Sequence, residues 1–270
     1  FWNLNGSIQT VSAEYYTTVM PTPTSAATAA QLLDRSTMRD ITGSGIYIQQ
    51  SGDNLSLTVN QHGDNNLIAG TGTTAGSVAD ANIAGDWNTV TLTQGHIAGI
   101  SSDNVILFDL NGDHNTLTVE QGNVNVDTGG HRAKLDIDGS YNDIGLYQYN
   151  SGLLGAHFAN VAVTGSDNSI TAHQRDDGDK MLFVNITGSN STLTVNQKDA
   201  GEHFLDVTLG SNQTLSVTQE GSGDHAATVN MSGYASGLTL NQNSVTDQNY
   251  YLYQNCTNLN GCGTTTVNQN

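Results

Sequence analysis

The feature that most constrains this chain is a short alternation of aliphatic and polar residues that ends in Gln. Each copy has two aliphatic residues at alternate positions and then Gln, as in Leu193, Val195 and Gln197. Alternation is the side-chain period of a β-strand with one buried face. The copies recur 22 to 33 residues apart. Strands at such a period predict a solenoid, in which each repeat forms one coil stacked on the coil before it.

The terminal Gln residues share parity with the aliphatic residues, so they are predicted to point inward. A lone buried amide costs a few kcal/mol, but amides stacked at about 4.8 Å can bond to one another. A ladder of this kind requires coils in parallel register. The residues of the predicted structural Gln ladder are Gln61, Gln94, Gln121, Gln148, Gln174, Gln197, Gln219, Gln242 and Gln269. The residues Asn88, Asn115, Asn142 and Asn168 open the same strands and suit a second ladder of the same type.

A second alternating run follows each first strand, as in Leu205-Val207-Leu209. Two strands in every coil predict an all-β fold, a parallel β-solenoid of about eight coils. It spans residues 43–270, with the extra residues of long repeats, such as Gly70–Gly76, between the first strand and the second. Residues 1–42 do not fit the repeat, and two interpretations stay open: a cap over the open end of the solenoid, or an arm that docks on a neighbouring molecule.

The net charge indicates which classes of partner the chain can bind, and the cysteines indicate the compartment in which it folds. The chain has a net charge of −18 with only seven Lys and Arg residues, which excludes nucleic acid and anionic lipid as partners. No apolar run approaches the roughly 18 residues of a membrane span. The chain begins with Phe1, so we interpret it as a processed, secreted form. Cys256 and Cys262 then predict a local disulfide, with two free thiols as the alternative.

Parts of the repeat resemble the curlin repeat. Gln61, Gly63 and Asn66 match its centre, and Gln219 with Gly221 match it more loosely. Curlins are the subunits of curli, the extracellular amyloid fibres of bacterial biofilms. The chain departs from that pattern because the second Gln of the repeat is kept only at Gln254. Elsewhere the position is aliphatic: Ile83, Leu110, Ile137, Val163, Ile186, Leu209 and Met231.

The resemblance, of a distant curlin-like repeat protein, implies a structural function rather than an enzymatic one. The expected function is a subunit that polymerises with itself into a curli-like fibre outside the cell, with the help of secretion and nucleation factors. No Ser-His-Asp or paired-carboxylate constellation recurs at one site, so no enzyme is predicted. The alternative is a secreted, monomeric solenoid that binds ice or glycan. Ice binding would use the outward threonines of the first strands, such as Thr89, Thr91 and Thr116, but Asp143 and Tyr147 interrupt this array.

Two patterns raise the question of metals, although no cofactor is expected. His131, His157, His203 and His225 occupy equivalent positions with Lys180 between them, so stacking predicts a column. The column suits either a metal ion or a polar corner of the coil. Asp-rich corners, such as those at residues 51–54, 62–66 and 176–180, contain the oxygen ligands of calcium, but turn chemistry alone also explains them.

The two ends of the array predict how subunits join. The array opens with a second strand and closes with a first strand that no second strand follows. One chain could therefore complete a coil of the next, and such a head-to-tail contact generates a filament. The predicted subunit contact consists of Ile46, Ile48, Gln50, Thr265, Val267 and Gln269.

Overall fold

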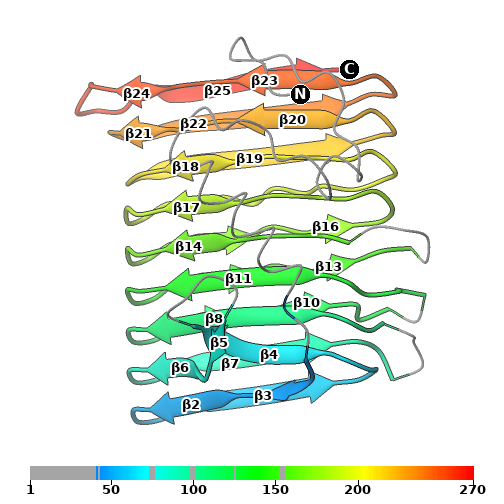
Figure 1. Ribbon diagram of the computed structural model, residues 1–270. Coiled ribbons are helices and arrows are strands. Elements are labelled where there is room, and N and C mark those ends of the chain that lie inside the picture. Colours follow the sequence, from blue (N-terminus) through cyan, green and yellow to red (C-terminus); the bar gives the residue numbers. More distant parts are fainter. Residues whose placement is uncertain (1–40, 42, 73–76, 98–100, 125, 152–155) are drawn as a thin grey trace.

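The computed structural model describes residues 41, 43–72, 77–97, 101–124, 126–151 and 156–270. These residues form the predicted all-β fold, a parallel β-solenoid of about seven turns, close to the eight expected. Figure 1 shows the strands as stacked rungs, with the chain rising from blue to red. No helix in this part of the chain is long and apolar enough to cross a membrane.

One face of the solenoid, which we call the glutamine face, contains the strands that end in the repeated Gln. Its strands pair in parallel and place each Gln directly beside the Gln of the next coil, as in Gln61 beside Gln94. The strands of this face are β3 (Ser56–Gln61), β7 (Thr89–Gln94), β9 (Thr116–Leu117), β10 (Glu120–Gln121), β12 (Asp143–Gly145), β13 (Gln148–Tyr149), β15 (Ser169–Thr171), β16 (Gln174–Arg175), β19 (Gln213–Glu220), β22 (Ser236–Asn243) and β25 (Gly263–Gln269).

The opposite face contains the second strand of each coil and is also parallel, apart from the short β5 (Val78–Ala79). Its other strands are β1 (Gly45–Ile46), β2 (Ile48–Ser51), β4 (Leu67–Thr71), β6 (Ala81–Ala84), β8 (Val105–Asn111), β11 (Arg132–Ile137), β14 (Val161–Val163), β17 (Val184–Ile186), β18 (Val207–Leu209), β20 (His225–Thr228), β21 (Ser232–Gly233), β23 (Gln248–Tyr251) and β24 (Asn255–Cys256). Aliphatic side chains from both faces meet in one core, in which residues such as Leu92, Phe108 and Leu135 are fully buried.

The first long repeat differs from the prediction, because its extra residues lie within the second strand rather than before it. β4 pairs with the first half of β8, and β6 pairs with the second half. Between them the chain turns back at β5, which pairs antiparallel with β4. The chain crosses itself closely at Gly70, where a Cβ would lie 2.7 Å from the Cα of Ala81. Glycine is therefore required at this crossing.

The corners that lead to the glutamine face depend on stacked glycines. Gly112 has a φ of +114°, and a Cβ there would lie 2.0 Å from the carbonyl oxygen of Gly139. The predicted Asn ladder lies beside these glycines, but its bonds differ from those expected. The Asn115 side chain accepts a bond from the backbone N–H of Asn142 and donates to the carbonyl of Gly139, both at 2.9 Å. The Asn side chains thus join one coil mainly to the backbone of the next.

A second apolar cluster lies on the outward side of the opposite face. It includes Phe158, Phe183 and Phe204, whose rings meet edge to face with centroids 5.7 and 5.4 Å apart. Ile41 packs in the same cluster. The predicted cap or arm of residues 1–42 lies outside the described residues apart from Ile41, which therefore contacts the side of the solenoid.

The predicted disulfide is present at the C-terminal end. Cys256 and Cys262 are bonded, with their Cα atoms 5.8 Å apart. The bond closes the loop between β24 and β25, and Cys256 is buried. A crosslink of this kind restricts the loop and fixes the point where β25 begins.

Candidate functional site

The glutamine ladder runs without a break from Gln61 to Gln269. Each Nε2 donates to the Oε1 of the next Gln, and the eight donor–acceptor distances lie between 2.7 and 3.1 Å. The glutamines from Gln94 to Gln242 are fully buried. Since every amide bonds to the amide above it, the ladder binds the coils into one stack.

Most ladder amides use their second N–H as well. Gln94 donates to the carbonyl of Leu67 at 3.0 Å, and Gln121 donates to that of Val105 at 3.1 Å. These carbonyls lie where the chain enters the opposite face, so each amide also joins the two faces of the solenoid. An inward polar side chain is tolerated here because its donors and acceptor are satisfied.

All the ladder amides point in the same direction, which makes the two ends of the solenoid chemically different. Gln61 donates upward to Gln94, so its carbonyl oxygen lies toward the end of the stack. At the other end, Gln269 accepts from Gln242 and donates one N–H to the carbonyl of Asn249. An amide has two N–H donors, so Gln269 keeps a second one. One end therefore offers an acceptor and the other offers a donor.

Within the part of the chain that the structure describes, no further strand covers the apolar core at either end of the stack. Core residues of the inner coils are about 0–2 % exposed, whereas those of the end coils are only partly buried. The partly buried residues at the first end include Ile48, Leu57 and Val59, and those at the last end are Tyr250, Leu252 and Val267. Stacked coils that end without covering their core present unpaired strand edges together with apolar side chains.

The residues predicted to make the subunit contact lie at these two ends. Ile46 lies in β1 and is 47 % exposed, and Ile48 and Gln50 lie in β2, which pairs with the opposite-face strand β6. Thr265, Val267 and Gln269 lie in β25, which pairs with β22. β2 and β25 are separated by the whole stack in Figure 1. Within one chain the two groups therefore cannot meet, and a contact between them requires a second molecule.

The predicted histidine column is a buried stack. The rings of His131 and His157 have centroids 4.8 Å apart, and those of His203 and His225 are 4.9 Å apart. Lys180 lies between the two pairs and its side chain is fully buried. Its Nζ donates to four backbone carbonyls, those of Asp177, Gly178, Asp199 and Gly201.

Burial controls the protonation of this column. It lowers the pKa of His157 and His203 well below 6.5, with the nearby charge of Lys180 acting in the same direction. Burial also lowers the pKa of His225, and it lowers that of Lys180 to about 8. The lowered pKa values keep His157, His203 and His225 neutral at pH 7, and each of these three donates from Nε2 to a backbone carbonyl.

Sequence reasoning missed Asp127, which supports the first histidine of the column. Its carboxylate lies 2.9 Å from Nε2 of His131, and both side chains are fully buried. Burial raises the pKa of Asp127, but the bond and charge of His131 outweigh it together with bonds from Asn150 and Ser101, so the net shift is downward. Asp127 lies outside the regular strand pattern, in a loop, and for that reason no periodicity reveals it.

The column predicts that acid destabilises this protein. The unfolded chain has ordinary histidine pKa values near 6.5, whereas the folded values are lower, so the unfolded state binds more protons as the pH falls below 6.5. The stability is fully present above that pH and decreases below it. We expect the midpoint temperature of thermal unfolding to decrease when the pH is lowered from 7 to about 5. Substitution of His157 and His203 by Asn should make this decrease smaller. If the thermal midpoint of the variant decreases with pH as steeply as that of the wild type, the buried histidines are not the cause of the acid sensitivity.

Neither pattern that suggested a metal forms a ligand cluster. In the residues that the structure describes, no group of three or more His, Cys, Asp or Glu side chains is arranged to hold a metal ion. At the Asp-rich corners the carboxylates bond to backbone. At residues 176–180, Asp176 accepts from the N–H of Asp199 at 3.2 Å, and Asp179 accepts from that of Ala156 at 3.0 Å. At residues 51–54 and the equivalent corners of the next coils, the N–H of Asp53 donates to Asp86 at 2.7 Å and that of Asp86 donates to Asp113 at 2.8 Å.

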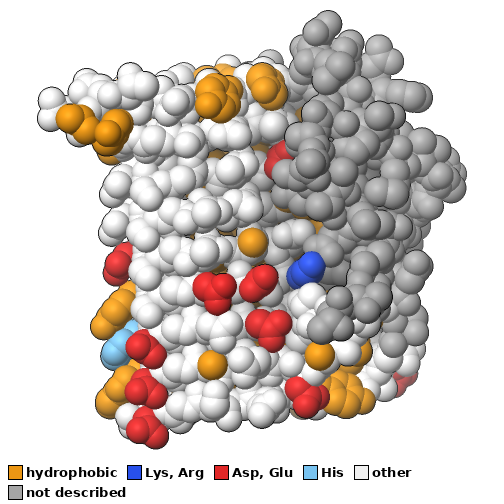
Figure 2. Space-filling model, turned by 60° about the vertical axis from the view of Figure 1, so that its left-hand side comes forward, with side chains coloured by type: hydrophobic (Ala, Val, Ile, Leu, Met, Phe, Trp, Pro, Cys, Tyr) orange, Lys and Arg blue, Asp and Glu red, His pale blue; other side chains and the backbone are white. Residues whose placement is uncertain are grey.

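An exposed aromatic column lies at the same corners. Trp87, His114 and Tyr141 stack with centroids 6.1 and 4.7 Å apart, and each has a φ near +60°. Asn54, Asp167 and other Asn or Asp residues hold this left-handed position in the remaining coils. In Figure 2, orange and pale-blue side chains with red carboxylates beside them follow the lower half of the left-hand edge of the molecule. Stacking across coils offsets part of the strain of this conformation.

The outward threonines align over the first coils and again over the last two, where Thr239 lies beside Thr266. Thr58 lies beside Thr91, and Thr89 lies beside Thr116. Asp143 lies next to Thr116 in the following coil, so it interrupts the threonine array as the sequence predicted. This arrangement does not favour a flat ice-binding surface.

The geometry is thus a polar ladder with two different ends, an open core and a buried histidine column. Comparisons of the chain with protein-family models, with curated proteins and with solved structures give no match.

Proposed function

We propose that this protein is the subunit of a fibre that grows by head-to-tail stacking of its solenoid. The observation that supports this proposal most directly is the pair of ladder ends. Stacking would place the donor end, Gln269, against the acceptor end, Gln61, of the next molecule. A ninth amide bond would then continue the eight that each chain contains.

The strand edges fit the same arrangement. β25 of one molecule would pair with β3 of the next, and β23 would pair with β2. The strands at both ends run parallel to those of the inner coils. β25, for example, pairs with β22 in parallel register over seven residues, so its free edge matches the edge of an inner strand. This contact is heterologous, so it does not close on itself and extends indefinitely. The partly exposed core residues at the two ends would be buried in the same step.

The curlin-like repeat supports a curli-like fibre outside the cell, at a bacterial surface or in a biofilm matrix. The disulfide Cys256–Cys262 supports an oxidising compartment. The charge of −18 favours solubility of the free subunit, because like charges repel until stacking offsets them. Chaperones and a nucleating partner are implied by the resemblance alone.

Negative-stain microscopy of the purified protein tests the proposal. Unbranched fibres are expected after incubation, and persistent monodisperse particles at all concentrations would overturn it. A deletion of residues 264–270 tests the contact itself, since it removes nearly all of β25 and leaves β22 as the last strand of the glutamine face. The truncated protein should remain soluble and fail to extend wild-type seeds. Elongation at the wild-type rate would show that β25 is not part of the contact.

A further inference from the structure

The solenoid has a groove on its side where one corner is shorter than the others. In most coils four residues join the last inward residue of the opposite face to the first inward residue of the glutamine face, as residues 187–190 join Ile186 to Ser191. Only three, residues 210–212, join Leu209 to Gln213. This corner is recessed between its neighbours, and the recess forms a groove of about 650 Å³.

The interior and the backbone adapt to the short corner. Gln213 replaces the usual Asn, and its longer side chain donates to the carbonyls of Ser211, Gly233 and Tyr234. A Cβ on Gly210 would lie 3.4 Å from its nearest neighbour, the Cα of Ser232, whereas at Gly112 the distance is 2.0 Å. The coil above is therefore farther away at this corner. The hydrogen bonds of Gln213 beneath the corner keep the polar groups of the short connection paired, so the groove remains open.

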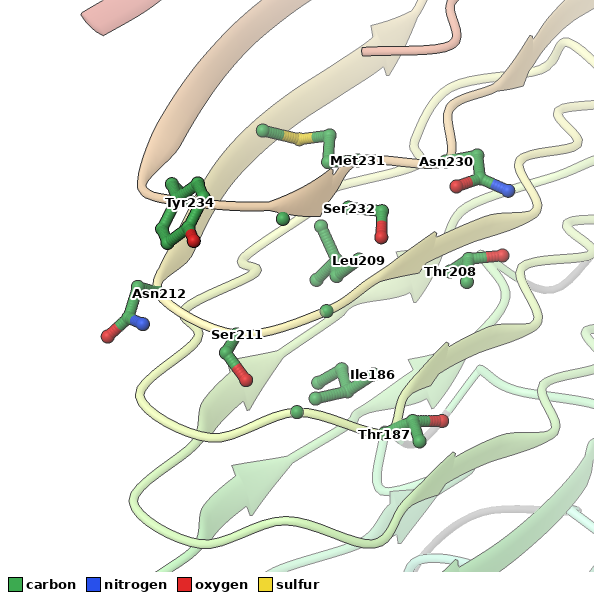
Figure 3. Close-up of a pocket in the computed structure, with 13 residues that line it drawn as sticks. Ile186, Thr187, Thr208, Leu209, Ser211, Asn212, Asn230, Met231, Ser232 and Tyr234 are labelled. Carbon is green, nitrogen blue, oxygen red and sulfur yellow. The ribbon is translucent and has the colours of Figure 1, made fainter. Parts of the chain in front are cut away.

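The lining of the groove is uncharged, although the chain has 25 acidic residues. None of its 13 residues is Asp, Glu, Lys, Arg or His. Figure 3 shows Thr187, Thr208 and Asn230 on one side, with Asn212 and Tyr234 at the corner. Tyr234 is 46 % exposed. The groove thus combines an accessible aromatic ring with hydroxyl and amide groups that both donate and accept hydrogen bonds.

The geometry points to a binding site for a neutral saccharide in this groove. Sugar hydroxyls need mixed donors and acceptors, and the C–H face of a pyranose packs on an aromatic ring. A volume of about 650 Å³ lies within the range of small-ligand sites. A peptide strand is a poorer fit, because β18, the edge strand beside the groove, has only three residues. Acidic saccharides are disfavoured by the charge of the chain.

The site lies on the side of the stack and does not rest on the proposed fibre. In a fibre of stacked subunits, however, every subunit would present one copy along the same side. Weak binding of a single sugar would then become strong binding of a polysaccharide that spans several copies.

The test uses freshly purified full-length protein with two neutral probes, cellohexaose and maltohexaose, and titration calorimetry or saturation-transfer NMR. We expect one of them to bind with a Kd of about 1 mM or below. Tyr234→Ala should weaken binding at least about tenfold, and Tyr234→Phe should keep it within about threefold, since the ring remains. Tyr141→Ala, at the exposed corner of another coil, is the matched control and should bind as the wild type does.

A second variant tests the recess itself. Insertion of one Asn after Gly210 restores a four-residue corner and fills the groove, so binding should be lost while the circular dichroism spectrum is retained. The proposal is overturned if neither probe binds at about 10 mM, or if binding survives both Tyr234→Ala and the insertion. Fibre formation by these variants should be unchanged, which separates this outcome from failure of the proposed fibre.

Discussion

Thr266→Pro should block growth of the fibre while leaving the subunit folded. On the glutamine face, outward residues donate their backbone N–H to the coil above, as Thr89 does to the carbonyl of Asn115 and Thr116 does to that of Asn142. Thr266 is also an outward residue, in β25, which is the last strand of this face. Its N–H therefore points beyond the end of the stack. Proline there removes a donor that β22 does not use, and proline is tolerated on edge strands for this reason.

The expected result is loss of seed elongation by more than about tenfold, because proline at a strand edge prevents further pairing. The variant keeps its Gln61 end, so it should still add to the Gln269 end of a growing fibre and then stop it. Single-fibre fluorescence microscopy with labelled monomers measures both effects. Thr266→Ala keeps the N–H and should elongate normally. Growth of Thr266→Pro at the wild-type rate, with an unchanged thermal midpoint, would exclude β25 as the growing edge.

Gln121→Leu should destabilise the protein although leucine is the more hydrophobic residue. Gln121 accepts from Gln94 at 3.0 Å and donates to Gln148 at 2.8 Å and to the carbonyl of Val105 at 3.1 Å. Leucine would leave three buried polar groups without a partner. Each such group costs about 1–3 kcal/mol, and burial of leucine offsets about 2 kcal/mol, so a net loss of roughly 1–7 kcal/mol is expected.

The control is Gln61→Leu at the open end, where the side chain is only partly buried and water can replace the lost partners. Its expected cost is below about 1 kcal/mol. Thermal unfolding gives the overall effect, and hydrogen exchange gives its position. Because each coil contacts only its neighbours, protection should fall near residues 117–121 and 144–148 and remain elsewhere. A variant at Gln121 that melts at or above the wild-type temperature would show that the ladder does not stabilise the stack.

The sequence by itself determined the parallel solenoid, the inward glutamines and the register of one coil on the next. Alternation decides which face of a strand is buried, and an inward amide that recurs at one position can be satisfied only by the same amide in a neighbouring coil. The histidine column also followed from spacing, since equivalent positions of a repeat must stack, and the disulfide was predicted from two cysteines close together in a chain interpreted as secreted.

Only the tertiary structure decided how those side chains are bonded. Sequence spacing places Asn115 and Asn142 in one column. Whether the Asn115 side chain bonds to another side chain or to the backbone of the next coil depends on the corner glycines beside it. The direction of the glutamine amides likewise depends on carbonyls of the opposite face, such as that of Val105. Asp127 and the groove at Gly210 arise from irregular loops and a shortened corner, where no period exists and long-range packing alone sets the geometry.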